Sequence, residues 1–417
     1  MVHTTILYLA AVTLMALWVV YRRNPELFLC CLLFLNFECF YLLPQIGEAE
    51  NYKMLVLTMF PILLCELALR RKLTWGRYGH VIVSFLLLSA IAVAVALVSG
   101  QEIILGIKAA KMRILALAYF FVVALEINDV KFAKYFVIMG VVVAGIIFLG
   151  YALYGHINIF AYAPAKDFHV RSGHLRMVIG APLIAASACV AFARFVRTSS
   201  AFYLAAAVLL FMEMMFIQQI RIYVAGIFLS MLVLYGLSRS ISVGRILVYV
   251  MVALVFMAFW QFWLKSGVEN VGLVKLTQSE VMHQGGSYGA RVQAYAYYWR
   301  EIETSIFFGN GIRHSEWEKN PELRMQLRGI HLSDIGIMHL FVESGVLGLI
   351  WLVFALFFIW RDIIKFRNFL HISSYVVLAT IIIPLIDLLI RSDTAFVFVT
   401  FLGILSKSID RQLSITD

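Results

Sequence analysis

Long apolar stretches recur along the whole chain, and they constrain the fold more than any other feature of the sequence. Each is about 17 to 26 residues long, which as a helix rising about 1.5 Å per residue crosses roughly 30 Å of hydrocarbon. Hydrophobic residues make up 63% of the 417 residues and charged residues only 14%, unlike the average soluble protein. We therefore expect an all-α integral membrane protein, with about 12 to 13 transmembrane helices in one domain, residues 1–417.

The first apolar stretch is followed by Arg22 and Arg23 rather than by a small-residue cleavage site. We expect it to remain as a span instead of being removed as a signal peptide. The expected spans are 4–21, 27–47, 54–69, 81–100, 103–126, 136–155, 178–193, 201–217, 222–238, 246–264, 335–360, 373–390 and a short one near 394–406.

Lys and Arg residues indicate the orientation, because cytoplasmic connections carry an excess of them. Seventeen fall on alternate connections, which predicts that those connections are cytoplasmic. The opposite, non-cytoplasmic side then holds two long loops, 156–177 and 265–334. All five cysteines lie within expected spans, and the sequence contains no Walker loop, HExxH or Cys-x-x-Cys motif, so we expect no disulfide, metal or other cofactor.

The second non-cytoplasmic loop is far longer than a connection requires, which is typical of functional loops. Residues 288–303 within it predict a helix lying on the membrane surface, with Arg291, Tyr295 and Tyr298 on one face and Trp299 on a neighbouring one. The helix anchors the loop at the interface through its aromatic residues, an interpretation that does not exclude a function of its own.

A glycine pair follows this helix, since Gly309 and Gly311 permit a tight turn. Arginines also recur on the predicted non-cytoplasmic side, where their planar forks suit a lipid-linked phosphate or pyrophosphate, the alternative being contact with lipid head groups. They are Arg171, Arg176, Arg221, Arg291, Arg300, Arg313, Arg324, Arg328 and Arg391.

Three further cations, Lys108, Lys111 and Arg113, lie inside the expected span 103–126. They either extend to the membrane interface or line a polar cavity that opens onto the same outer face.

The expected span 335–360 opens with ionisable residues. Asp334 lies at its outer end, three residues after His331, where a hydrated carboxylate could act as a general base. His339 and Glu343 follow deeper in the span at a spacing of i, i+4, and we interpret them as a mainly structural pair. Gly345 and Gly348 are expected to let a neighbouring helix pack closely.

The order of these motifs resembles the O-antigen ligase and Wzy-type polymerase superfamily of bacterial inner-membrane glycosyltransferases. The resemblance covers residues 171–348 only; outside it, only the many-span architecture agrees. Its motifs are Arg171-Ser-Gly173 ahead of Pro182, Gln219-Ile-Arg-Ile-Tyr-Val-Ala225, Ala290-Arg-Val-Gln-Ala-Tyr-Ala-Tyr-Tyr-Trp299, Phe308-Gly-Asn-Gly311, Ser333-Asp-Ile-Gly336 and Val342-Glu-Ser-Gly-Val-Leu-Gly348.

The resemblance implies a GT-C-like helical fold that transfers a glycan from undecaprenyl pyrophosphate to a hydroxyl on the periplasmic side without a metal. Its pyrophosphate-binding arginines match Arg221 and Arg291. This chain has Asp334 where the family usually has its histidine base, which leaves the base open between Asp334 and His331 and favours a polymerase over a ligase. The implied partners are the lipid-linked donor and acceptor oligosaccharides, membrane lipids and a chain-length regulator.

The substrate-binding residues expected around this centre are Arg171, Arg176, Tyr295, Tyr298, Trp299, Arg313, Arg328, Lys108 and Lys111. A ligase that attaches the glycan to lipid A-core is the alternative within the same class. A flippase for lipid-linked sugars is the alternative from another class, because transporters also place carboxylates inside spans, as at Glu38, Glu66, Glu213 and Asp387.

Overall fold

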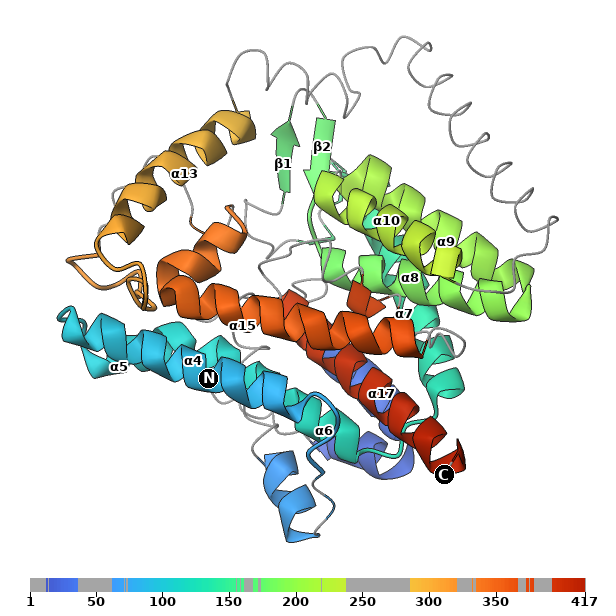
Figure 1. Cartoon of the computed structure of the whole chain (residues 1–417). Coiled ribbons are helices and arrows are strands. Elements are labelled where there is room, and N and C mark those ends of the chain that lie inside the picture. The colour runs from blue at the N-terminus through green and yellow to red at the C-terminus, as the bar shows by residue number, and fades with distance from the viewer. Residues whose placement is uncertain are drawn as a thin grey trace.

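The structure of the chain is a computed structural model (Figure 1). It describes residues 13, 15–36, 62–70, 72, 74–154, 156–157, 159–160, 168–171, 174–218, 220–237, 286–320, 332, 335–366, 373–374, 376–378 and 392–416.

Helices account for most of these residues. Their bounds are α2 (Pro25–Asn36), α4 (Gly79–Val98), α5 (Ile103–Ala110), the 3-10 helix η1 (Lys111–Leu117), α6 (Ala118–Ala124), α7 (Asp129–Ala152), α8 (Ala181–Thr198), α9 (Ala201–Glu213), the π-helix η3 (Met214–Gln218), α10 (Arg221–Leu237), α13 (Gly286–Glu303), α15 (Ile337–Lys365) and α17 (Ser392–Thr416).

Within the described part of the chain, five helices are long and apolar enough to cross a membrane: α4, α7, α8, α9 continued by η3, and α15. The prediction of a mainly helical, membrane-embedded chain is confirmed in this form. The expected span 103–126 is helical too, but its middle turns are wound as the 3-10 helix η1 between α5 and α6. The expected span 246–264 lies outside the described residues, and several others are described only in part.

Two helices are enclosed by the rest of the bundle. Residues 181–193 of α8 and 394–406 of α17 are all buried. The sequence predicted a short final span near 394–406, whereas α17 is a 25-residue helix. Its apolar signal is weak because α17 packs against protein, and buried hydroxyls such as Thr400 and Ser406 are tolerated there.

The all-α prediction missed one element, a β-hairpin in the expected loop 156–177. Strands β1 (Phe168–Arg171) and β2 (His174–Met177) pair antiparallel, with Phe168 opposite Met177 and Arg171 opposite His174. Each strand has only four residues, too short for an alternating pattern to be recognised in sequence. In the view of Figure 1 the hairpin stands between α13 and α10.

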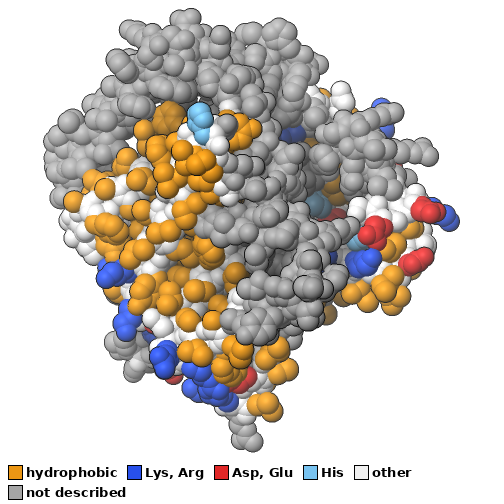
Figure 2. Space-filling view, turned by 180° about the vertical axis from the view of Figure 1, so that it is seen from behind, with side chains coloured by type: hydrophobic (Ala, Val, Ile, Leu, Met, Phe, Trp, Pro, Cys, Tyr) orange, Lys and Arg blue, Asp and Glu red, His pale blue; other side chains and the backbone are white. Residues whose placement is uncertain are grey.

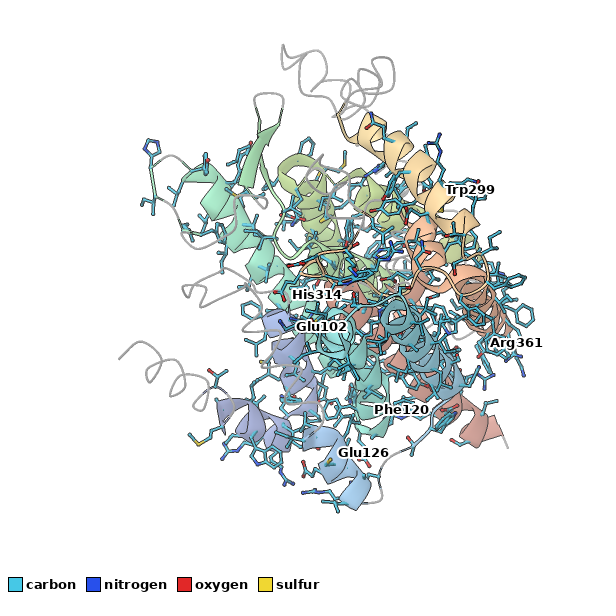
Figure 3. The ribbon with its side chains drawn as sticks, turned by 90° about the vertical axis from the view of Figure 1, so that its left-hand side faces the viewer. Glu102, Phe120, Glu126, Trp299, His314 and Arg361 are labelled. Atoms are coloured by element: carbon cyan, nitrogen blue, oxygen red, sulfur yellow. The ribbon has the colours of Figure 1, made fainter. Side chains whose placement is uncertain are left out.

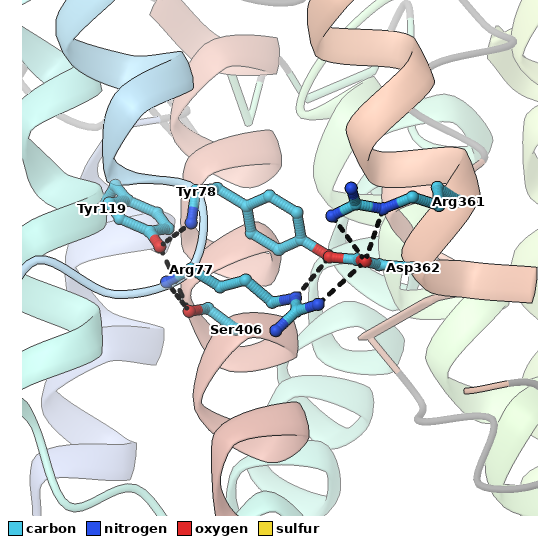
Figure 4. A network of polar contacts seen from close by, with 6 residues as sticks. All are labelled: Arg77, Tyr78, Tyr119, Arg361, Asp362 and Ser406. Carbon is cyan, nitrogen blue, oxygen red and sulfur yellow. Dashed lines mark hydrogen bonds and ion pairs between the residues drawn. The ribbon is translucent and has the colours of Figure 1, made fainter. Parts of the chain in front are cut away.

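Several of the connections predicted to be cytoplasmic meet, in their described parts, at one end of the bundle, which we call the basic end. Asp362 of α15 binds both Arg77 and Arg361 there, with Arg77 Nη2 at 3.0 Å from Asp362 Oδ1, and Ser406 of α17 accepts from the Arg77 N–H at 2.7 Å (Figure 4). Arg411 likewise donates to the Ile127 carbonyl at 3.2 Å. Figure 2 shows Lys and Arg side chains gathered at the lower left, beside a broad hydrophobic surface.

The other end of the bundle, which we call the loop end, holds the connection after α4 and the segment 305–320. Its position follows from the chain path, since α4 starts two residues after Arg77 and ends before Gln101. Gln101 is buried and its side chain contacts the 305–320 segment. The two ends are therefore separate, as the alternating Lys and Arg pattern predicted; which end faces the cytoplasm stays a prediction.

Candidate functional site

Helix α15 is interrupted at Gly345, which has φ 60° and ψ −152° inside an otherwise helical run. A regular helix would bond the N–H groups of Val346 and Leu347 to the carbonyls of Val342 and Glu343. The break frees all four groups. In an apolar environment each freed group must find another partner, because an unpaired backbone group there costs several kcal/mol.

The loop after α13 supplies these partners. The N–H groups of Asn310 and Gly311 donate to the carbonyls of Val342 and Glu343 at 2.6 and 3.1 Å. In return, Val346 donates to the Ile306 carbonyl at 2.9 Å and Leu347 to that of Phe307 at 3.4 Å. Four backbone hydrogen bonds to the loop thus replace the helical hydrogen bonds that the break removed. The loop is paired with α15 through its backbone.

Glycine is required where the loop touches the break. Gly309 has φ 70°, and a Cβ added to it would lie 2.6 Å from backbone atoms of Glu343, Ser344 and Gly345. The predicted tight turn at Gly309 and Gly311 is confirmed, since both have positive φ. The expected close packing of a neighbouring helix is wrong at Gly345, where an added Cβ would meet the backbone of Ile306 and Phe307. At Gly348 the nearest atoms to an added Cβ belong to Ser344 and Leu340 of α15 itself.

Further contacts fix the same loop from α4 and the residues after it. The Ile312 N–H donates to the Ala92 carbonyl at 3.1 Å. The buried side chain of Gln101 donates to the Ile312 carbonyl at 3.1 Å and accepts from the His314 N–H at 2.8 Å. Figure 3 shows Glu102, the next residue, beside His314. The segment predicted as a surface loop is therefore partly a buried connector between α4 and α15.

A buried ionic network lies beside the break. Arg113 of η1 forms an ion pair with Glu343 of α15, and both side chains are almost fully buried, 5% and 8% exposed. His339 Nε2 lies 3.3 Å from the other oxygen of Glu343. Arg113 also donates to Ser89 Oγ at 3.3 Å and lies over the Phe85 ring. The predicted pairing of His339 with Glu343 is confirmed, but Arg113 is its third member.

Helix α13 packs on the start of α15 and leaves a groove between them. The groove has a volume of about 490 Å³ and is lined by Tyr295, Ala296, Trp299, Arg300, Glu303 and Met338. Trp299 is 57% exposed, and Figure 3 shows it on the outer side of α13. Tyr295 is half exposed, and its hydroxyl donates to the Ile335 carbonyl at 2.9 Å. This bond joins the groove to the residue that follows Asp334 in the sequence.

Tyr298 occupies a different environment from the other two aromatic residues predicted for substrate binding. It is 1% exposed and packs with Ile302, Ile335 and Met338 in a small core between α13 and α15. Its ring therefore offers no open face to a ligand. The helix itself was predicted correctly, but the side of α13 that carries Tyr298 packs against α15.

Two of the remaining predicted cations, Arg313 and Lys108, form ion pairs at the loop end. Arg313 Nη1 lies 3.3 Å from Glu301, and Lys108 Nζ lies 3.0 Å from Glu316. The hydrogen bond from Lys108 lowers the pKa of the Glu316 carboxyl, and the charge of Lys111 adds to this effect. Lys108 and Glu316 are both about half exposed, so the pair lies at the surface.

The predicted arginines of the reaction centre are placed only in part. Arg291 is exposed on α13, and Arg221 is the first residue of α10. Arg171 and Arg176 lie on β1 and β2. Five predicted residues lie outside the described residues: Arg324, Arg328, His331, Asp334 and Arg391.

The sequence analysis named Arg113 as a cation that could line a polar cavity but missed its pairing with Glu343, and it did not single out Gln101 at all. Arg113 was grouped with Lys108 and Lys111 as a cation near a span end, and its partner is 230 residues away. The sequence did hold one indication of this pairing. Arg113 and Glu343 are opposite charges inside two apolar spans, and charges inside spans usually pair with each other. Gln101 carried no comparable signal.

In the described ranges, no group of three or more His, Cys, Asp or Glu side chains is arranged to hold a metal ion. A scan against protein-family models and a search among curated proteins found no match to this chain.

Proposed function

We propose that this chain is a glycosyltransferase with a GT-C-like fold that elongates a polysaccharide in the bacterial inner membrane. Its donor is a glycan on undecaprenyl pyrophosphate, and its acceptor is a hydroxyl of a second lipid-linked repeat unit. The reaction takes place at the loop end, facing the periplasm. The observation that carries the proposal is the groove beside α13, which combines exposed faces of Trp299 and Tyr295 with the charged groups of Arg300 and Glu303.

The groove suits a carbohydrate for a chemical reason. Aromatic faces pack against the apolar C–H face of a sugar ring, and charged groups at the rim exchange hydrogen bonds with its hydroxyls. Its place next to Ile335 puts a bound acceptor near the start of α15. The loop end also lies opposite the basic end, which agrees with a periplasmic site.

In the proposed reaction the acceptor hydroxyl oxygen attacks the anomeric carbon of the donor, and the bond from that carbon to the pyrophosphate oxygen breaks. Arg221 and Arg291 neutralise the pyrophosphate as it departs. Asp334 or His331 takes the proton of the hydroxyl. The products are the lengthened glycan and the free lipid pyrophosphate.

The test uses the purified chain in lipid nanodiscs with synthetic undecaprenyl-pyrophosphate repeat units, and glycan length is read on a gel. We expect a ladder of longer chains. Arg291→Ala should abolish it, and Arg291→Lys should recover little, because a lysine does not reproduce the bidentate fork. Transfer only when lipid A-core is supplied indicates a ligase. Movement of the lipid-linked sugar across a bilayer without any transfer refutes the enzyme and indicates a flippase.

The groove has its own variant pair. Trp299→Ala should raise the KM for the acceptor by up to about tenfold, since aromatic packing contributes roughly 0.5–1.5 kcal/mol. Trp299→Phe should retain most of the affinity. Trp360→Ala is the matched control, because Trp360 is also an exposed tryptophan but lies next to Arg361 at the basic end. Equal effects of the two alanine variants would mean that Trp299 only anchors α13 in the interface.

A further inference from the structure

We infer that Arg113 is a positioning residue of the transfer reaction: by holding Glu343 it fixes the segment 337–344 of α15 that borders the groove. This inference rests on the proposed function for its kinetic part and on the structure alone for its positioning part. It starts from the break at Gly345, which divides α15 into two segments.

The break leaves the first segment without a rigid connection to the rest of α15. Helical hydrogen bonds normally carry the orientation of one turn to the next, and here they are replaced by bonds to the loop 306–311. The orientation of the first segment must therefore be set by its side contacts. Those of Glu343 are central, because its carbonyl binds Gly311 while its carboxylate binds Arg113 and His339.

The first segment forms one side of the groove. Met338 lines the groove directly, and Ile335, two residues before the helix, accepts the hydroxyl of Tyr295. Asp334 precedes Ile335 in the sequence. A shift of this segment would move the groove wall and the start of α15 together. Displacement by about 1 Å can lower a reaction rate by about 100-fold.

Stability alone does not account for the Arg113–Glu343 pair. Removing two charges from water costs about as much as their attraction returns, so apolar side chains of similar size often serve equally well. The geometry around the pair is specific: Ser89 and Phe85 of α4 hold the guanidinium from the other side. The pair thus links α4, η1 and the first segment of α15 at one point.

The experiment replaces both charges at once, in the variant Arg113→Met/Glu343→Leu, so that no unpaired charge stays buried. The matched control is Arg77→Met/Asp362→Leu at the basic end. It removes a second ion pair of α15, in which Asp362 is buried and Arg77 partly buried. Two quantities are measured in nanodiscs: kcat and KM of transfer per folded molecule, and hydrogen exchange of the peptide that covers 306–311. Arg113→Lys tests rescue by a conserved charge.

We expect the Arg113/Glu343 variant to fold, to keep its donor KM within about twofold and to lose about 100-fold in kcat. The amide hydrogens of its 306–311 peptide should exchange at least about tenfold faster. The reason is that the backbone carbonyl at position 343, which accepts from the Gly311 N–H, is no longer held in place. Arg113→Lys should recover part of both quantities, and the control should change neither. If wild-type protein transfers no glycan but the exchange responds as expected, the proposed function fails while the positioning role stands. Normal kcat in the double variant, or exchange equal to that of the control, overturns the inference.

Discussion

The N–H of Asn310 donates to the carbonyl of Val342 at 2.6 Å, a hydrogen bond that a regular helix would have given to Val346. Through this bond the loop after α13 pairs with the backbone of α15 at its break, instead of only lying on the surface of the helix. The groove, the break and the Arg113–Glu343 pair consequently form one structural unit at the loop end. A change at any of these points should be felt at the others.

The backbone of Gly345 leads to the first prediction. Gly345→Ala should lower the free energy of unfolding by at least about 1–3 kcal/mol, because its φ and ψ are accessible almost only to glycine. A Cβ there would also collide with the carbonyl oxygens of Ile306 and Phe307. The measurement is thermal unfolding in detergent, followed by tryptophan fluorescence.

The control for this variant is Gly145→Ala in α7, where an added Cβ meets open space. It should leave the stability unchanged or raise it by about 0.5–1 kcal/mol, the ordinary advantage of alanine in a helix. Comparable losses in the two variants would mean that the loop and the break do not form the contact described.

The network at the basic end predicts different consequences for its two arginines. Asp362 is 1% exposed and receives Arg77 and Arg361, but only Arg361 is itself half exposed. Arg77→Ala should destabilise the protein by about 3–5 kcal/mol, since it leaves a buried carboxylate without its main partner. Arg361→Ala should cost at most about 1 kcal/mol. Melting temperatures in one detergent give the comparison, and a reversed order would contradict the network in Figure 4.

The sidedness of the bundle can be tested with single cysteines. Ser315 is exposed at the loop end, and Ser414 is exposed near the end of α17. In a chain without its native cysteines, Ser315→Cys should react with an impermeant thiol reagent added to intact cells. Ser414→Cys should react only after lysis. The opposite labelling pattern would reverse the orientation that the seventeen basic residues predict.

The surface pair of Lys108 and Glu316 predicts a pH dependence. The pKa of Glu316 is lower in the folded protein than in the unfolded chain, chiefly because Lys108 binds its carboxylate. The contact therefore contributes at pH values above the unfolded pKa and is lost as the pH falls through the folded one. Lys108→Met should raise the pKa of Glu316 in a carboxyl NMR titration. Lys319→Met, the same change three residues from Glu316, should leave it in place.

The sequence by itself determined the class of the protein and the arrangement of its ends. The length of each apolar stretch and the Lys and Arg residues that flank it are local properties of the sequence. They predict a span and its orientation without reference to the rest of the chain. The same holds for the turn at Gly309 and Gly311, whose positive φ values follow from what glycine allows. For the same reason the pair His339 and Glu343, one helical turn apart, could be predicted.

Only the tertiary structure decided what these local features meet. Arg113 and Glu343 are 230 residues apart, and the residues around each of them do not identify the other as its partner. The break at Gly345 was missed because its freed backbone groups are satisfied by a loop whose partners lie 32 or 40 residues upstream, a pairing that side-chain patterns do not encode. The burial of Tyr298 beside an exposed Trp299 likewise depends on how α13 lies against α15. Long-range packing and backbone pairing, unlike hydrophobic length, are properties of the folded chain as a whole.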